Sequence, residues 1–224
     1  MELNTSAPAR KVVSRSPIRS VRRLNLPGIF PQPIECESSL ERDFVLRVAL
    51  CPGVTQLQHQ PFRLELPGGK RYTPDFLVTF RSGDRVVVEV KHSERMQRYA
   101  QVFAQARQLL SRTGIGFLVL TEAEIRYRAA HERAALVLRY RKLAVSPSAK
   151  ERVLTCLRAH PHGLELAQLQ RRCSVHRTDV LGLAAAKAVR VSRAIDLDDD
   201  SRFFLNSSTE AEHEVHLEDW FATS

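Results

Sequence analysis

The sequence predicts an α/β domain followed by a smaller α+β domain. Residues 75–80 and 85–91 are two short runs rich in β-branched and aromatic residues, and the turn residues Ser82-Gly83-Asp84 separate them, which is typical of a hairpin. A helical stretch and a buried strand follow, and beyond residue 150 come three helices and a two-stranded ribbon. This order favours a mixed sheet flanked by helices, with a second domain after it.

The first predicted helix covers residues 37–50 and is ended by Pro52-Gly53. At about 100° per residue, one half of its circumference is apolar and contains Leu40, Phe44, Val45, Val48 and Ala49. Glu41 falls inside this apolar arc, where a carboxylate is costly unless a charged group meets it. Two interpretations stay open: a metal ion at the adjacent sheet, or a capping box in which Glu41 folds back to Ser38.

The hairpin places charged residues on a buried sheet. Glu89 and Lys91 are two residues apart and so share a face with Val87, whereas Val86, Val88 and Val90 point into the opposite layer. Asp75 begins the first strand of the hairpin.

Phosphodiester hydrolysis explains why these residue types would stand together. Mg²⁺ neutralises charge on the scissile phosphate and activates water, and it prefers carboxylate oxygens at roughly 2.0 to 2.1 Å. Asp75 and Glu89 suit the ligand role, and Lys91 can hold the attacking water or the charge of the phosphorane. The alternative is a surface hairpin with a solvated Asp and a Glu-Lys pair, because such short motifs recur by chance.

Four segments together resemble the TnsA endonucleases: Cys36–Asp43, Gln58–Arg63, Tyr72–Phe76 and Glu89–Lys91. These endonucleases are subunits of heteromeric cut-and-paste DNA transposases, and their catalytic domain belongs to the PD-(D/E)xK nuclease superfamily. The resemblance covers roughly residues 20 to 125 with specific motifs and the rest more loosely. It implies a restriction-endonuclease-like core.

The resemblance also implies a catalytic set of Glu41, Asp75, Glu89 and Lys91, with Mg²⁺ held by the three carboxylates and Mn²⁺ as a substitute. In the best-studied member the residue matching Glu89 is Gln, so this chain is closer to the general superfamily pattern. Gln60 matches a position common in the family. It would orient a water or fix a strand end, or be a structural amide.

The activity and partners implied by the resemblance are specific. The chain would hydrolyse one strand, on the 5′ side, at transposon ends. A DDE-type transposase subunit would cut the other strand, and an ATP-dependent regulator subunit would complete the complex. The setting would be bacterial and cytoplasmic. Two alternatives stay open: a stand-alone restriction or repair nuclease, and a non-catalytic DNA-binding adaptor with a degenerate nuclease-like domain.

The nuclease domain is predicted to cover residues 35–145. After Lys91 comes a basic helix over residues 95–111, whose apolar face would pack on the sheet and whose Arg95 and Arg98 are candidate DNA contacts. Residues 115–120 predict a buried strand. A helix from 121 to 140 is predicted to follow.

Residues 145–148 predict a linker, and residues 148–206 a winged-helix-like domain. Its helices are expected at 150–160, 164–172 and 176–187, and its strands at 189–192 and 203–205. The third helix is poor in side chains that read bases, so a protein partner and a DNA groove both stay open.

Charge is distributed unevenly along the chain. It has 34 Lys and Arg against 25 Asp and Glu. Residues 196–224 hold nine of the acidic groups and one basic group, which leaves 33 basic and 16 acidic groups, or +17, before residue 196. Such a body favours a polyanionic partner such as DNA, with a steep salt dependence. Charge alone does not exclude non-specific binding.

The ends of the chain differ in charge. Residues 1–34 predict a basic arm that either follows a DNA backbone or is solvated, with candidate contacts at Arg10, Lys11, Arg15, Arg19, Arg22 and Arg23. Residues 207–224 predict an acidic, mobile tail whose Trp220 and Phe221 could instead order on a partner.

The cysteines and the hydropathy pattern bear on the compartment. The four cysteines form no C-x-x-C pair and have no histidine at zinc spacing, which indicates a reduced, cytoplasmic protein. The amino-terminal stretch has no apolar run long enough for a signal peptide or a membrane span, and we expect no membrane partner.

Overall fold

The computed structural model describes residues 22–206 and 216–223, and its chain divides into two compact units. The first contains the described residues of 1–45, 53–125 and 222–224, and the second those of 46–52 and 126–221.

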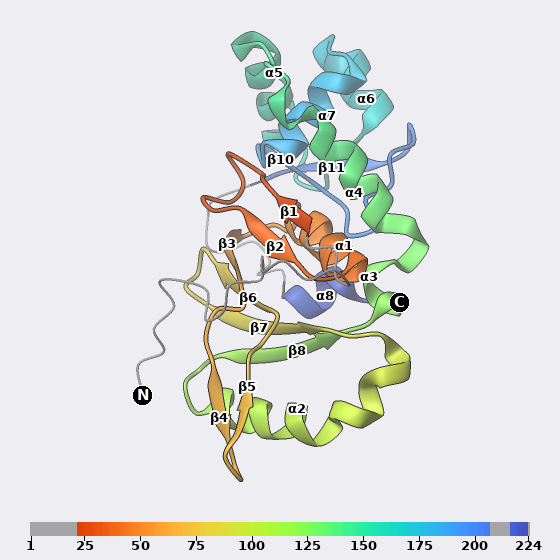
Figure 1. Ribbon diagram of the computed structural model, residues 1–224. Coiled ribbons are helices and arrows are strands. Elements are labelled where there is room, and N and C mark those ends of the chain that lie inside the picture. Colours follow the sequence, from red (N-terminus) through yellow and green to blue (C-terminus); the bar gives the residue numbers. More distant parts are fainter. Residues whose placement is uncertain (1–21, 207–215, 224) are drawn as a thin grey trace. The chain divides into compact units, whose positions relative to one another are not determined.

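The first unit is built on a mixed four-stranded sheet (Figure 1). Its strands are β3 (Val54–His59), β6 (Phe76–Phe80), β7 (Arg85–Val90) and β8 (Gly116–Leu120), in the order β3-β6-β7-β8. β6 pairs antiparallel with β3 and β7, whereas β7 and β8 run parallel. A parallel pair needs a crossover, and α2 (Met96–Ser111) supplies it. The predicted mixed sheet with a covering helix is therefore confirmed.

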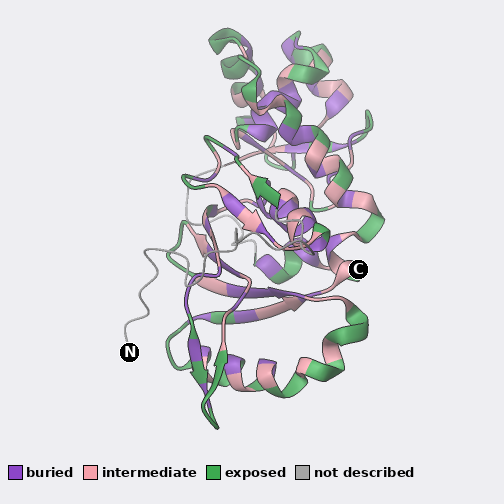
Figure 2. Cartoon of the chain, in the orientation of Figure 1, coloured by how far each residue is buried: buried purple, intermediate pink, exposed green. Residues whose placement is uncertain are grey.

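The strand residues alternate between two faces, as the hairpin pattern predicts. Leu77 lies opposite Val87, and both belong to a buried cluster with Phe103 of α2. Phe76 lies opposite Val88, and its ring centroid is 5.0 Å from that of Phe44 in α1 (Ser39–Val48). The strands that carry these residues are buried along most of their length (Figure 2). Asp75 lies two residues before Leu77, and Glu89 lies two residues after Val87. Because residues two apart on a strand share a face, both carboxylates lie on the face covered by α2.

Two hairpins that the sequence did not predict accompany this sheet. β1 (Arg22–Leu24) pairs antiparallel with β2 (Ile34–Cys36), and β4 (Leu64–Leu66) pairs antiparallel with β5 (Lys70–Tyr72). Each strand has only three residues, which is too short for a clear alternation signal. The second hairpin delivers Tyr72 to the start of β6.

The single helix predicted from residue 121 to 140 is wrong. The segment is α3 (Glu122–Ile125), a 3₁₀ turn (Tyr127–Ala129), α4 (Ala130–Arg139) and a second 3₁₀ turn (Tyr140–Lys142). Arg128 and Ala129 have φ of 45° and 57°, a left-handed conformation that interrupts a right-handed helix. The division between the units falls at this break, after Ile125, and not at residues 145–148.

The second unit places three helices against a small antiparallel sheet. These three are α5 (Pro147–Arg158), α6 (Leu166–Cys173) and α7 (Arg177–Ala185), close to the predicted ranges, and the unit also contains α4 and a short helix over Leu217–Phe221. β9 (Leu164–Glu165), β10 (Val189–Val191) and β11 (Arg202–Leu205) form the sheet in the order β10-β11-β9. Where the sequence predicts a linker, Ser146 caps α5 by accepting a hydrogen bond from the Ala149 N–H at 3.2 Å.

The acidic end of the chain differs from a mobile tail in its last part. Residues Leu217–Phe221 form α8, and Leu217, Trp220 and Phe221 are buried. Within the second unit, Arg47 donates to the Trp220 carbonyl at 2.8 Å, and its guanidinium carbon lies 4.4 Å from the centroid of the Phe221 ring. Burial of two aromatic rings offsets the cost of ordering this segment. Residues 207–215 lie outside the described residues.

Within residues 22–206 and 216–223, none of the helices combines the length and apolar character that crossing a membrane requires.

Gly163 tests the packing of the second unit. It has a φ of +73°, and a Cβ there would lie 2.6 Å from the Phe203 carbonyl oxygen and from a ring carbon of Phe204. Gly68 has a similar φ of +81° but open space around the same position. Gly68→Ala should therefore cost about 1 to 2 kcal/mol from strain alone, and Gly163→Ala distinctly more. Urea denaturation of both variants measures this, and equal costs would contradict the packing described.

Candidate active site

Asp75 and Glu89 face each other where β6 begins and β7 ends. Asp75 precedes the paired residues Phe76 and Val88, so the antiparallel register brings Glu89 opposite it. The Val90 N–H donates to Asp75 Oδ2 at 2.9 Å, which fixes the carboxylate against the β7 backbone. The Asp75 N–H donates to Glu89 Oε2 at 3.4 Å. Both carboxylates are thus held by backbone groups of the neighbouring strand.

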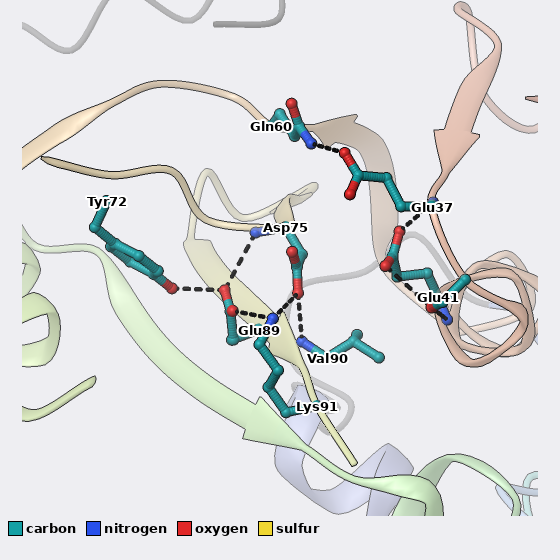
Figure 3. A network of polar contacts seen from close by, with 9 residues as sticks. Glu37, Glu41, Gln60, Tyr72, Asp75, Glu89, Val90 and Lys91 are labelled. Carbon is teal, nitrogen blue, oxygen red and sulfur yellow. Dashed lines mark hydrogen bonds and ion pairs between the residues drawn. The ribbon is translucent and has the colours of Figure 1, made fainter. Parts of the chain in front are cut away.

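Lys91 stands between the two carboxylates (Figure 3). Its Nζ lies 2.7 Å from Glu89 Oε1 and 3.6 Å from Asp75 Oδ2. The exposed fraction of the side chain is 4% for Glu89, 19% for Asp75 and 24% for Lys91, so the group is half-enclosed and open on the side of Asp75 and Lys91. The structure therefore brings together the three residues that the hairpin pattern predicts.

The charges in this group do not balance. Burial raises the pKa of Asp75 well above its usual range, and Glu89 raises it further. Burial alone would lower the pKa of Lys91, but Asp75 and Glu89 together raise it above the usual value. One ammonium thus faces two carboxylates in a partly water-free site. An additional positive charge would relieve the repulsion between the two carboxylates.

Glu41 is hydrogen-bonded at the amino-terminal end of α1, where Ser38 caps the helix. The Glu41 N–H donates to Ser38 Oγ at 3.1 Å, and Ser38 Oγ donates to Glu41 Oε1 at 3.0 Å. Glu41 Oε2 also accepts from the Glu37 N–H at 2.7 Å. Burial raises its pKa, and its charge contributes to the raised pKa of Asp75. The Ser38 half of the predicted cap is observed, but the Glu41 carboxylate binds the Ser38 hydroxyl and the Glu37 N–H in place of the Ser38 backbone. The metal-ligand interpretation stays a prediction.

Gln60 makes structural contacts. Its N–H donates to the Asp75 carbonyl at 2.8 Å, and its Nε2 donates to Glu37 Oε1 at 3.0 Å. Its φ of 44° is left-handed, so the chain turns sharply at the end of β3. These contacts suit a residue that fixes a strand end and links the sheet to the start of α1. Orientation of a water by Gln60 stays a prediction.

The donor set can be compared with the needs of a divalent cation. Among the described residues, no three His, Cys, Asp or Glu side chains gather in an arrangement able to hold a metal ion. Glu41 is hydrogen-bonded to Ser38, and Lys91 contacts both Asp75 and Glu89. The chemistry nevertheless fits, because a buried carboxylate and a half-buried one beside a single ammonium offer hard oxygen donors and more negative than positive groups.

The predicted DNA contacts lie in several places. Arg95 and Arg98 are exposed at the start of α2, a few residues after Lys91. Arg22 and Arg23 are exposed on β1, which is paired with β2 and is not part of an unpaired arm. Arg10, Lys11, Arg15 and Arg19 lie outside the described residues.

Tyr72 is a site residue that the sequence reasoning missed. Its hydroxyl donates to Glu89 Oε2 at 2.6 Å. Burial and the charge of Glu89 raise its pKa, so the phenol stays protonated and remains a donor. The available signal was its position at the end of a polar turn, three residues before Asp75, but β5 is too short to predict from its pattern.

A mixed sheet flanked by helices, with an Asp and a Glu-x-Lys on adjacent strands, defines an endonuclease-like core. The family described as TnsA-like endonuclease N terminal has a model that matches residues 51–122, about a third of the chain. Residues 51–122 are therefore similar to a TnsA-like endonuclease domain, and the resemblance seen in the motifs within this range is confirmed. The match includes Asp75, Glu89 and Lys91 but begins after Glu41. No curated protein sequence matches the chain.

The raised pKa of Asp75 predicts a pH-dependent stability. The folded state holds the Asp75 proton more tightly than the unfolded state, so stability falls as pH rises above the ordinary value of 3.8 toward the raised folded value. Asp75→Asn removes this loss and still accepts from the Val90 N–H. We expect the variant to be more stable than wild type at pH 8, and the difference to shrink toward pH 4, where Asp75 is protonated in both states.

Denaturant unfolding of the metal-free chain at several pH values measures this difference. Asp84→Asn is the control, because it removes the same charge from an exposed turn residue. If Asp75→Asn were less stable than wild type at pH 8, the folded state would favour the ionised form of Asp75, which would contradict this account.

Proposed function

We propose that this protein is a Mg²⁺-dependent DNA endonuclease subunit of a heteromeric transposase. It would hydrolyse one strand, on the 5′ side, at transposon ends during cut-and-paste transposition. The observation that carries the proposal is the contact of Lys91 with both Asp75 and Glu89 on adjacent strands of a TnsA-like endonuclease domain. The transposase and the ATP-dependent regulator enter through the resemblance, as does a cytoplasmic location.

Asp75 and Glu89 would hold the metal ion, with Glu41 as a third ligand if its side chain leaves the cap. The bound ion would supply Lewis-acid stabilisation of the scissile phosphate and lower the pKa of a bound water. Lys91, already between the carboxylates, would orient the attacking water or stabilise negative charge on phosphate oxygens. Backbone N–H groups hold both carboxylates in place, so the rearrangement needed for a metal ion to enter would fall on Lys91 and Glu41.

A DNA substrate agrees with the charge of the chain. The exposed Arg95 and Arg98 follow the catalytic hairpin directly in sequence and sit at the first turn of α2. Together with the excess of +17 before residue 196 they favour contact with phosphates. Such contacts position a duplex without reading its sequence.

The second unit supports a winged-helix-like assignment through its order of helix, strand, two helices and two strands. All six residues from Val180 to Ala185 of α7 are buried. A helix buried in this way offers only its first turn to a DNA groove. This burial favours a partner-binding role for the unit over base reading by α7.

Metal binding by calorimetry tests the proposal. We expect Mn²⁺ to bind the full chain in the presence of a DNA duplex, and Asp75→Asn and Glu89→Gln each to weaken binding at least ten-fold, because each removes a charged ligand. Asp84→Asn, in the exposed turn of the same hairpin, is the matched control and should bind as wild type does.

Two outcomes would point elsewhere. Absence of Mn²⁺ binding by wild type would favour the non-catalytic adaptor. Binding accompanied by cleavage of DNA by the purified chain alone would favour a stand-alone nuclease, because a transposase subunit should need its partner.

A further inference from the structure

The side chains of Glu89 and Lys91 are both in contact with tyrosines. Glu89 Oε2 accepts from the Tyr72 hydroxyl at 2.6 Å, a length typical of a hydrogen bond to an ionised acceptor (Figure 3). On the other side, Lys91 Nζ lies 5.6 Å from the centroid of the Tyr99 ring, within the range of a cation–π interaction. Tyr72 comes from β5 and Tyr99 from α2.

One buried ring links the two tyrosines. Phe103, one turn after Tyr99 on α2, is 4% exposed. Its centroid lies 5.8 Å from that of Tyr99 in a stacked arrangement and 6.5 Å from that of Tyr72 in an edge contact. Aromatic pairs at these separations are mutually attractive and resist reorientation. We call Tyr72, Tyr99 and Phe103 the aromatic cluster.

The cluster contacts two side-chain groups, the Lys91 ammonium and the Glu89 carboxylate, that could otherwise rotate. Lys has four rotatable side-chain bonds, and its ammonium makes compact, non-directional contacts. Glu89 has one oxygen toward Lys91 and the other toward Tyr72 and the Asp75 N–H, so the Tyr72 hydroxyl decides which way the carboxylate plane turns. Without it, one backbone donor at 3.4 Å would remain for Oε2.

We propose that Tyr72 and Tyr99 are positioning residues, Tyr72 orienting the Glu89 carboxylate and Tyr99 confining the Lys91 ammonium, with Phe103 holding both tyrosines. This rests on the proposed function for its consequence in metal binding, but the orientation itself belongs to the metal-free chain. Through these contacts, the positions of the Glu89 carboxylate and the Lys91 ammonium depend on how α2 packs on the sheet.

The first test uses side-chain NMR of the full chain without metal. Tyr99→Leu removes the ring current over Lys91, and we expect the Lys91 ε-methylene signals to move to the position of an exposed lysine. Tyr99→Phe keeps the ring and should leave them in place. Tyr72→Phe removes only the hydroxyl and should shift the Glu89 side-chain carboxyl carbon, assigned with Glu89→Gln. Tyr127→Phe, at an exposed tyrosine, is the control.

The second readout is Mn²⁺ affinity in the presence of a DNA duplex. Loss of a partner that orients a ligand weakens metal binding roughly 10- to 100-fold, and we expect about ten-fold for Tyr72→Phe with an unchanged melting temperature. Unmoved Lys91 and Glu89 signals in Tyr99→Leu and Tyr72→Phe would overturn the proposal. So would shifted signals with Mn²⁺ affinity within two-fold of wild type. If wild type binds no Mn²⁺, the proposed function fails and the NMR signals alone decide whether the cluster positions the pair.

Discussion

The site depends on two carboxylates and one ammonium held together where β6 begins and β7 ends. Asp75 and Glu89 are brought opposite each other by strand register, and Lys91 lies within 2.7 Å of one and 3.6 Å of the other. Burial makes this arrangement costly, because it strengthens the repulsion between the carboxylates and removes their hydration. Conversely, the same burial makes the site receptive to an added cation.

The surrounding fold supplies what the charged group lacks. Leu77 and Val87 continue the two strands into a buried cluster with α2, so the strands that carry the carboxylates are fixed by apolar packing. Backbone N–H groups of Val90 and Asp75 satisfy the carboxylate oxygens. Apolar packing of the strands and hydrogen bonds from their backbones therefore offset the free-energy cost of burying these charges.

The sequence pattern predicts those parts of the fold whose apolar residues recur at a regular spacing. The alternation of Val87 with Glu89 and the apolar face of α2 are periodic, so the sheet face, the covering helix and the triad of Asp75, Glu89 and Lys91 could be predicted. The break at Arg128 and Ala129 could not, because a left-handed backbone at non-glycine residues leaves no mark in hydropathy. Tyr72 was missed for a related reason, since its role arises from a three-residue hairpin and a single hydroxyl contact.

Glu41 shows why composition leaves some roles open. Its place in an apolar arc suggested both a cap and a ligand, and the structure has it in the cap. A capping bond contributes about 1 kcal/mol, which a metal ion could readily exceed. A metal-ligand role for Glu41 would require the side chain to leave this cap, and it stays a prediction.

Anomalous diffraction from crystals of the full chain grown with a DNA duplex and Mn²⁺ tests the central claim most directly. We expect an anomalous peak at roughly the 2.0 to 2.1 Å that carboxylate oxygens keep from a small divalent cation, in contact with both Asp75 and Glu89. A peak on other residues, or none while Lys91 stays on both carboxylates, would contradict a metal-dependent nuclease site.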